Sequence, residues 1–109
     1  MINVEILKKD EHIERIAVTG HALYAPYGED IVCSGVSALC QACAESLLKL
    51  TKGKFDVGVD SGDFYIAVID HGAKENAVKV NVLLDGLAIG LNSIEESYPN
   101  YVKVKERRI

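Results

Sequence analysis

The spacing of apolar residues changes along this chain, and the changes divide it into strands and helices. Apolar and polar residues alternate through INVEILK (residues 2–8) and again through IERIAVTG (13–20), with a polar turn at 8–11 between them. A period of two is typical of half-buried strands, and two such strands joined by a short turn predict a hairpin. A connector at residues 20–30 follows this hairpin.

From Ile31 the spacing of apolar residues becomes three and four, which predicts a helix that ends near Gly53. Either Asp30 or Ser34 can cap the start of this helix. The apolar stripe that we expect to be buried consists of Val36, Cys40, Cys43, Leu47 and Leu50.

The second half of the chain repeats this order of elements. Residues 54–70 predict a second hairpin, which turns at 61–63, and residues 75–97 keep a helical rhythm until Pro99. The segment YVKVKERR then predicts a short closing strand. The order ββαββαβ predicts an α+β fold, a two-layer sandwich of a mostly antiparallel sheet and two helices, with residues 1–109 forming a single domain.

Composition and charge narrow the class of protein. An apolar content of 49% in 109 residues argues against disorder, and 16 acidic against 12 basic residues give a net charge of −4. This balance disfavours a direct nucleic-acid partner. We find no signal peptide and no uninterrupted apolar run of membrane-spanning length. Three cysteines, an odd number, favour a reducing compartment. We therefore expect a cytoplasmic protein without a membrane partner.

A cysteine and a histidine in the connector segment suggest catalysis. Cys33 falls in the first turn of the predicted helix, where unpaired backbone N–H groups and the helix dipole favour a thiolate and could hold an oxyanion. His21 lies twelve residues upstream, across a loop long enough to bring its imidazole to the helix start. A thiol and an imidazole within hydrogen-bond reach make an activated nucleophile. A cysteine at such a position is otherwise a small apolar core residue.

The rest of the connector leaves alternatives open. Asp30 can orient His21 or cap the helix, and the sequence does not separate these roles. Tyr24 and Tyr27 form either a flap that faces substrate or a surface loop anchored by aromatic rings. Gly20 and Gly28 can absorb backbone rotation, so we expect the loop between them to move when substrate binds.

Other polar motifs have ordinary structural interpretations. Cys40 and Cys43 form a C-x-x-C inside the helical stripe, which favours core packing over redox chemistry. A zinc site made of these two with Cys33 and His21 is disfavoured by the helical separation of the cysteines. The pair Asp60 and Asp63 is typical of a turn, and the basic tail KVKERR of an edge strand with a solvated face.

The motifs GHA and YGEDIVCSGVSAL, with GLNSIEESYPNYVKV further on, resemble the ribosomal-processing cysteine proteases (Prp, YsxB-like) over essentially the whole chain. The resemblance implies that Cys33 is the nucleophile and His21 the general base. Gly20, Asp30 and Ser37 match the other characteristic positions of the family. One departure is that Ser34 and Gly35 follow the cysteine, where many members have two alanines; Gly35 could loosen the helix start.

The resemblance also implies a substrate and an assembly. Members remove a short N-terminal extension from the precursor of ribosomal large-subunit protein twenty-seven by Cys/His acyl transfer, and they are homodimers. We expect the same here, with no cofactor and no metal. The alternative function is a non-catalytic protein that associates with the ribosome or assists its assembly.

Overall fold

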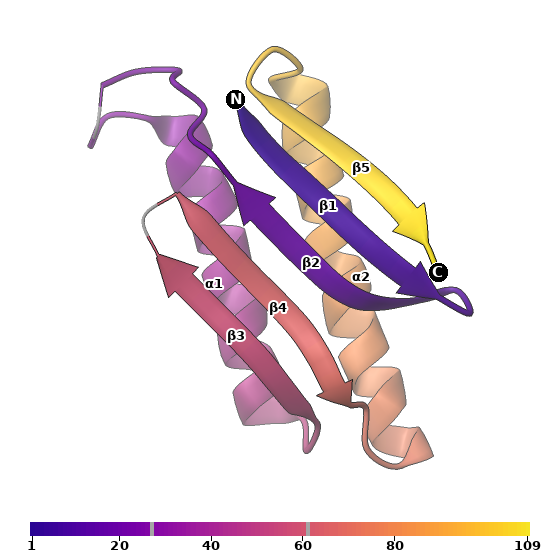
Figure 1. The fold of residues 1–109 in the computed structure, drawn as a ribbon. Helices are drawn as coiled ribbons and strands as arrows, with labels where there is room; N and C mark the ends of the chain where they lie inside the picture. Colours follow the sequence, from indigo (N-terminus) through magenta and orange to yellow (C-terminus); the bar gives the residue numbers. More distant parts are fainter. Residues whose placement is uncertain (27, 61) are drawn as a thin grey trace.

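A computed structural model describes residues 1–26, 28–60 and 62–109. The elements alternate as two strands and a helix, twice over, and then a closing strand (Figure 1). In chain order they are β1 (Ile2–Lys9), β2 (His12–Thr19), α1 (Ile31–Leu50), β3 (Lys54–Asp60), β4 (Asp63–Asp70), α2 (Lys74–Ser97) and β5 (Val102–Arg108). The predicted order ββαββαβ and the α+β class are confirmed.

The strands form a single five-stranded sheet in the order β3-β4-β2-β1-β5. Neighbouring strands are antiparallel except β1 and β5, which run parallel because the chain crosses over through α2 before β5. The sheet is therefore mostly antiparallel, as predicted. The closing strand β5 lies at one edge and β3 at the other.

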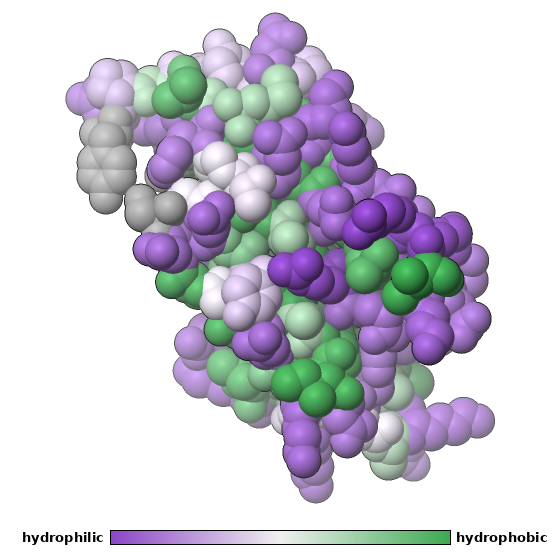
Figure 2. Space-filling view, viewed as in Figure 1, coloured by the Kyte–Doolittle hydropathy of each residue, from purple (hydrophilic) through white to green (hydrophobic). Residues whose placement is uncertain are grey.

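Both helices pack on one face of this sheet, and the core lies between the two layers (Figure 1). The strand register aligns apolar side chains on that face: Ile6 pairs with Ile16, and Val18 pairs with both Val4 and Phe64. The other face is uncovered, and hydrophilic residues predominate on it with scattered apolar ones (Figure 2).

The helices bury the stripes that the sequence predicts, with one exception. Val36, Cys40, Cys43 and Leu47 of α1 are buried, but Leu50 is 62% exposed. Leu50 is the last residue of α1, where the chain turns away toward β3, so no element covers it. By length and composition alone either helix could cross a membrane. Each helix packs one apolar face against the sheet. Other apolar side chains stay exposed, among them Leu48 on α1 and Val78, Val82 and Ile89 on α2.

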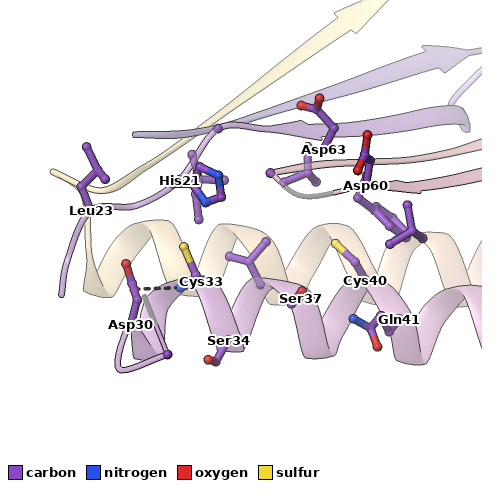
Figure 3. Close-up of a pocket in the computed structure, with 18 of the residues that line it drawn as sticks. His21, Leu23, Asp30, Cys33, Ser34, Ser37, Cys40, Gln41, Asp60 and Asp63 are labelled. Carbon is purple, nitrogen blue, oxygen red and sulfur yellow. Dashed lines mark hydrogen bonds between the residues drawn. The ribbon is translucent and has the colours of Figure 1, made fainter. Parts of the chain in front are cut away.

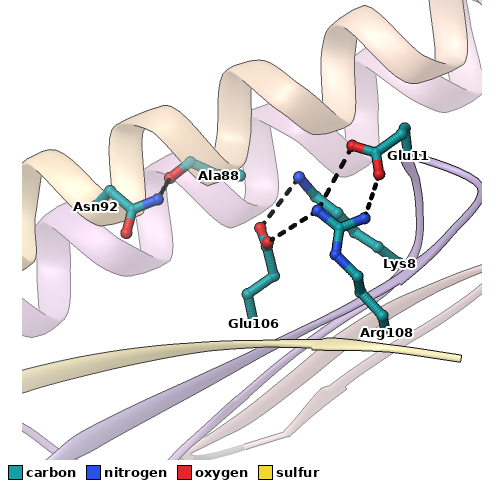
Figure 4. Close-up of polar contacts among 6 residues, drawn as sticks. All are labelled: Lys8, Glu11, Ala88, Asn92, Glu106 and Arg108. Atoms are coloured by element: carbon teal, nitrogen blue, oxygen red, sulfur yellow. Dashed lines mark hydrogen bonds and ion pairs between the residues drawn. The ribbon is translucent and has the colours of Figure 1, made fainter.

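Ion pairs cluster at the end of the sheet farthest from the connector. Lys8 lies 3.0 Å from Glu106, and the Arg108 guanidinium contacts Glu11 and Glu106 (Figure 4). On the uncovered face Arg107 pairs with Glu5 at 3.1 Å. Much of the basic tail is thus neutralised locally, which agrees with its predicted place on a solvated edge strand.

Candidate active site

Asp30 fixes the start of α1 and the connector together. Its carboxylate oxygen Oδ1 accepts hydrogen bonds from the backbone N–H groups of Val32 and Cys33, each at 3.0 Å, so Asp30 and not Ser34 is the N-cap. The other oxygen, Oδ2, accepts from the N–H of Tyr24 at 3.0 Å. The partners of Asp30 thus lie on the helix and the loop, as expected for a capping residue, and the Cys33 side chain is one of them beside the backbone groups.

The pKa of Asp30 reflects these bonds. Its side chain is only 7% exposed, and this burial by itself would raise the pKa of the carboxyl. The hydrogen bonds from the backbone N–H groups of Cys33 and Tyr24 outweigh burial, so the pKa of Asp30 lies below its ordinary value of 3.8. Asp30 is therefore a carboxylate at neutral pH, and the ionised form is the one that holds the loop and the helix.

Cys33 lies in the first turn of α1 and is half-buried, with its sulfur directed into a cavity (Figure 3). The backbone N–H of Ala22 donates a hydrogen bond to the Cys33 sulfur at 3.3 Å. Because Ala22 directly follows His21, the same bond brings the connector's histidine close to the thiol.

His21 reaches the cavity from the end of β2, on the side opposite Cys33 (Figure 3). Its ring packs against Gly62, where an added Cβ would lie 2.7 Å from the His21 Nε2 atom. Gly20 anchors this segment by donating its N–H to the carbonyl oxygen of Gly62 at 2.7 Å. No hydrogen bond joins the side chains of His21 and Cys33, both of which the structure describes. The two groups line the same cavity.

The cavity has a volume of about 630 Å³ and lies between α1 and the sheet. Its polar wall on α1 is formed by Ser34, Ser37 and Gln41, which are exposed along one side of the helix. Its floor is apolar, and Val59 and Asp60 at the end of β3 form the opposite rim. The apolar floor residues are Ile2, Val18, Val36, Cys40 and Phe64. A cleft of this kind suits a peptide with apolar side chains.

The remaining loop residues lie in different places. Gly28 lines the cavity in a left-handed conformation, with φ of +88°. The ring of Tyr24 packs edge-on against Tyr98 and Tyr101, with centroids 5.6 and 5.1 Å away, so it ties the connector to the segment before β5. Tyr27 lies outside the described residues.

Cys40 and Cys43 lie in the core, as their place on the helical stripe predicts. Burial raises the pKa of Cys40 to about 12, with the neighbouring Cys43 adding to it, and burial raises the pKa of Cys43 to about 11. The Cys43 thiol also donates to the Leu83 carbonyl oxygen at 3.5 Å. These are the properties of core thiols. Among the residues that the structure describes, no three His, Cys, Asp or Glu side chains are grouped as metal ligands.

The structure corrects one element of the expected chemistry. The N–H groups of Val32 and Cys33 bond the Asp30 carboxylate, and the N–H of Ser34 bonds the Asp30 carbonyl oxygen at 3.0 Å. The predicted oxyanion donors at the helix start are therefore already occupied. The N–H of Ala22 is the backbone donor that faces the sulfur, and sequence reasoning missed it.

Sequence reasoning also missed the part of the cavity contributed by the second hairpin. Asp60 and Asp63 flank the turn between β3 and β4, as the sequence predicts, and both also line the cavity (Figure 3). Gln41 and Val59 line it as well. The sequence contains no local signal for these positions, because only the pairing of β4 with β2 brings the second hairpin to the connector.

Comparison with known proteins places this geometry in a family. The model of the family "Cysteine protease Prp" matches residues 1–103. A ribosomal processing cysteine protease Prp of Bacillus subtilis is 31% identical over 97 residues, with 87% of each chain covered. The Prp of Staphylococcus aureus is 31% identical over 107 residues, covering 95% of this chain and 97% of the relative.

Solved structures agree with the sequence relatives. The S. aureus Prp with a covalently linked product peptide superposes with a TM-score of 0.88 at 29% identity, covering 98% of this chain and all of that one. The same protease with a substrate peptide gives a TM-score of 0.82 at 28% identity and the same coverage. The chain therefore belongs to the family of the cysteine protease Prp and is itself a cysteine protease.

Proposed function

We propose that this chain is the endopeptidase that removes the short N-terminal extension of ribosomal large-subunit protein twenty-seven, with Cys33 as nucleophile and His21 as general base. The observation that supports this most directly is the shared cavity. The Cys33 sulfur and the His21 ring both line this space of about 630 Å³, and the Ala22 N–H donates a hydrogen bond to the sulfur (Figure 3). The names of the relatives, ribosomal processing proteases, support the substrate class.

The first chemical step forms an acyl-enzyme. His21 takes the proton of the Cys33 thiol, and the sulfur forms a bond to the scissile carbonyl carbon while the carbonyl electrons move to oxygen. Collapse of this intermediate breaks the C–N bond, and the imidazolium of His21 returns its proton to the leaving amine. Water, deprotonated by His21, then hydrolyses the thioester and regenerates the thiol.

The Ala22 N–H is the donor best placed to hold the oxyanion. In the free enzyme it bonds the sulfur itself at 3.3 Å, and a carbonyl oxygen carried by that sulfur would lie within its reach. Asp30 supports this geometry because it fixes the loop at Tyr24 and the helix at Cys33. Gly20 lets the chain turn into the site with φ of +87°. Ser37, one turn after Cys33, lines the cavity where a peptide would pass.

The proposal extends to the assembly and location of the protein. We infer a single protease domain over residues 1–109 that acts as a cytoplasmic homodimer, as the family resemblance implies. The outward side of α2 exposes Val78, Val82 and Ile89, at 58%, 63% and 70%, a surface of the kind that a second copy would cover. Light scattering coupled to gel filtration measures the assembly directly, and a monomer at micromolar concentration would contradict it.

The test of the function follows the mass of the precursor. The purified chain, mixed with the extended ribosomal protein, should release the extension as a peptide, and Cys33→Ala and His21→Ala should not. Cys43→Ala removes a thiol from the same helix outside the cavity and should retain activity. Cleavage by Cys33→Ala at the wild-type rate would refute the assignment of the nucleophile.

A further inference from the structure

We propose that the substrate peptide binds as an additional strand on the free edge of β3, in the groove between this edge and α1. The proposal rests on the proposed function, since it takes the cavity that holds Cys33 to be a peptide site. It goes further by naming the backbone that the peptide pairs with and the alternation that such pairing imposes on the substrate.

The strand β3 has a partner on one side only. The sheet order places β4 on its inner side and no other strand of the described chain on its outer side. In an antiparallel pair, alternate residues direct their N–H and C=O groups away from the partner strand. The outer edge of β3 therefore carries backbone donors and acceptors that an extended peptide can bond, the arrangement used in strand addition.

This free edge leads into the site. Val59 and Asp60, the last two residues of β3, form the rim of the cavity into which Cys33 and His21 point (Figure 3). Val59 is apolar and yet 66% exposed, although the register places it beside the buried Phe64. A chain laid along β3 would cover Val59 and then arrive at the Cys33 sulfur.

The opposite wall of the groove is the polar side of α1. Ser34, Ser37 and Gln41 are exposed and line the cavity, at positions i, i+3 and i+7 of the helix. At about 1.5 Å of rise per residue they extend over about 10 Å, the length of about three residues of an extended chain. Their hydroxyl and amide groups face the side of the peptide that does not pair with β3.

Strand pairing predicts which substrates fit. Successive side chains of an extended peptide point in opposite directions, so every second one would enter the apolar floor while the others face solvent. The part of the floor contributed by α1 and by β4, the strand next to β3, consists of Val36, Cys40 and Phe64. We therefore expect the substrate segment in the groove to be apolar at alternate positions, whatever the identity of the residues between them.

The test uses the backbone of the substrate. A synthetic peptide that spans the extension and the cleavage site of the ribosomal precursor is N-methylated at one residue at a time, which removes one N–H per peptide. In the groove we expect kcat/KM to fall by about tenfold at every second residue and to change little at the residues between, since each lost bond costs about that factor. Equal effects at consecutive residues, or none beyond the scissile bond, would overturn the proposal.

A second measurement follows the enzyme and needs no cleavage. We would measure amide hydrogen exchange in Cys33→Ala with and without the unmodified peptide. The peptide should slow exchange at alternate residues of Lys54–Asp60 and leave the exchange rates unchanged at the other sheet edge, Val102–Arg108. Unprotected β3 amides with saturating peptide would refute strand addition even if the wild type cleaves the same peptide. Protected β3 amides with no cleavage by the wild type would instead refute the proposed function.

A pair of variants tests the α1 wall. Gln41→Ala should raise KM several-fold and leave kcat unchanged, because the amide contacts the peptide away from the scissile bond. Asn92→Ala is the matched control: this exposed amide on α2 bonds only the Ala88 carbonyl oxygen of its own helix (Figure 4). An unchanged KM for Gln41→Ala contradicts the placement of the groove along α1.

Discussion

The backbone N–H of Ala22 donates to the sulfur of Cys33, so the residue after His21 bonds the thiol directly. The backbone of the connector thus contacts the nucleophile directly, with no side chain between them. The Cys33 sulfur points into the cavity, on the side where His21 lies (Figure 3). Reactivity of this thiol should therefore respond to changes in the connector.

The three cysteines should differ in alkylation. Iodoacetamide at pH 7 should label Cys33 in the folded protein, because it is half-buried and opens into the cavity, and leave Cys40 and Cys43 unlabelled. Intact-mass spectrometry should show one adduct on the native chain and three after denaturation. Cys33→Ala should show none when folded, and His21→Ala should alter the pH profile of labelling. An adduct on Cys40 or Cys43 in the native chain would contradict their burial.

Stability should decline at alkaline pH through the core thiols. Burial raises the pKa of Cys43 to about 11 and that of Cys40 to about 12, from an ordinary value of 9.0. Above pH 9.0 the unfolded chain releases these protons while the folded chain keeps them, so unfolding becomes more favourable as pH rises. Urea unfolding at pH 8 and 10 measures the decline. Cys43→Ala should show a smaller decline than the wild type.

Replacing Asp30 should weaken both the helix and the loop. We expect Asp30→Ala to lower the free energy of unfolding by about 1–2 kcal/mol at pH 7, the usual cost of a lost N-cap. The folded pKa of Asp30 is lowered, so its contribution is present above about pH 3.8 and is lost as pH falls through the folded value. The difference between wild type and variant should therefore shrink in acid. Asp85→Ala, an exposed change on α2, should cost almost nothing at either pH.

Two glycines with the same backbone conformation allow the effect of backbone strain on stability to be distinguished from the effect of a steric clash. Gly20 and Gly28 have φ of +87° and +88°. A Cβ on Gly20 would lie 2.5 Å from the Met1 carbonyl oxygen, whereas a Cβ on Gly28 has open space around it. Both alanine variants should lose about 1 kcal/mol through positive φ, and Gly20→Ala should lose more and displace His21. Equal kcat/KM and equal unfolding midpoints for the two would contradict this.

The glycine that follows Cys33 by two residues should be replaceable. A Cβ on Gly35 would lie 3.6 Å from Cδ1 of Ile94, an ordinary contact, so Gly35→Ala should stabilise the helix by about 0.5–1 kcal/mol. Gly90→Ala is the comparison, since its Cβ would meet Leu39 at 2.9 Å and must push that side chain aside. Thermal unfolding of both variants distinguishes the two sites, and a lower midpoint for Gly35→Ala would contradict the expectation.

Much of the fold could be predicted because hydrophobic spacing is a local property. The period of two through residues 2–8 and 13–20 and the helical stripes each lie within one element, so no long-range contact is needed to detect them. Leu50 was misplaced because its position on the helical stripe carries no information about where the sheet stops covering α1.

The site could be predicted only in part for the same physical reason. Cys33 and Asp30 belong to one helix start, which sequence can identify, and the capping role that the sequence left open follows from the observed bonds to Val32 and Cys33. Asp60 reaches the cavity only through the pairing of the strands, and Ala22 contributes a backbone N–H rather than a side chain. Neither leaves a mark in residue type or spacing, so only coordinates reveal them.

The position of Met1 has a practical consequence for anyone who purifies this protein. The Met1 carbonyl oxygen lies against Gly20, one residue before His21, while Ile109 donates its N–H to the Lys8 carbonyl oxygen at the opposite end of the sheet (Figure 1). An affinity tag fused ahead of Met1 would emerge beside the mouth of the cleft and compete with incoming peptide. A tag appended after Ile109 would leave the entrance clear.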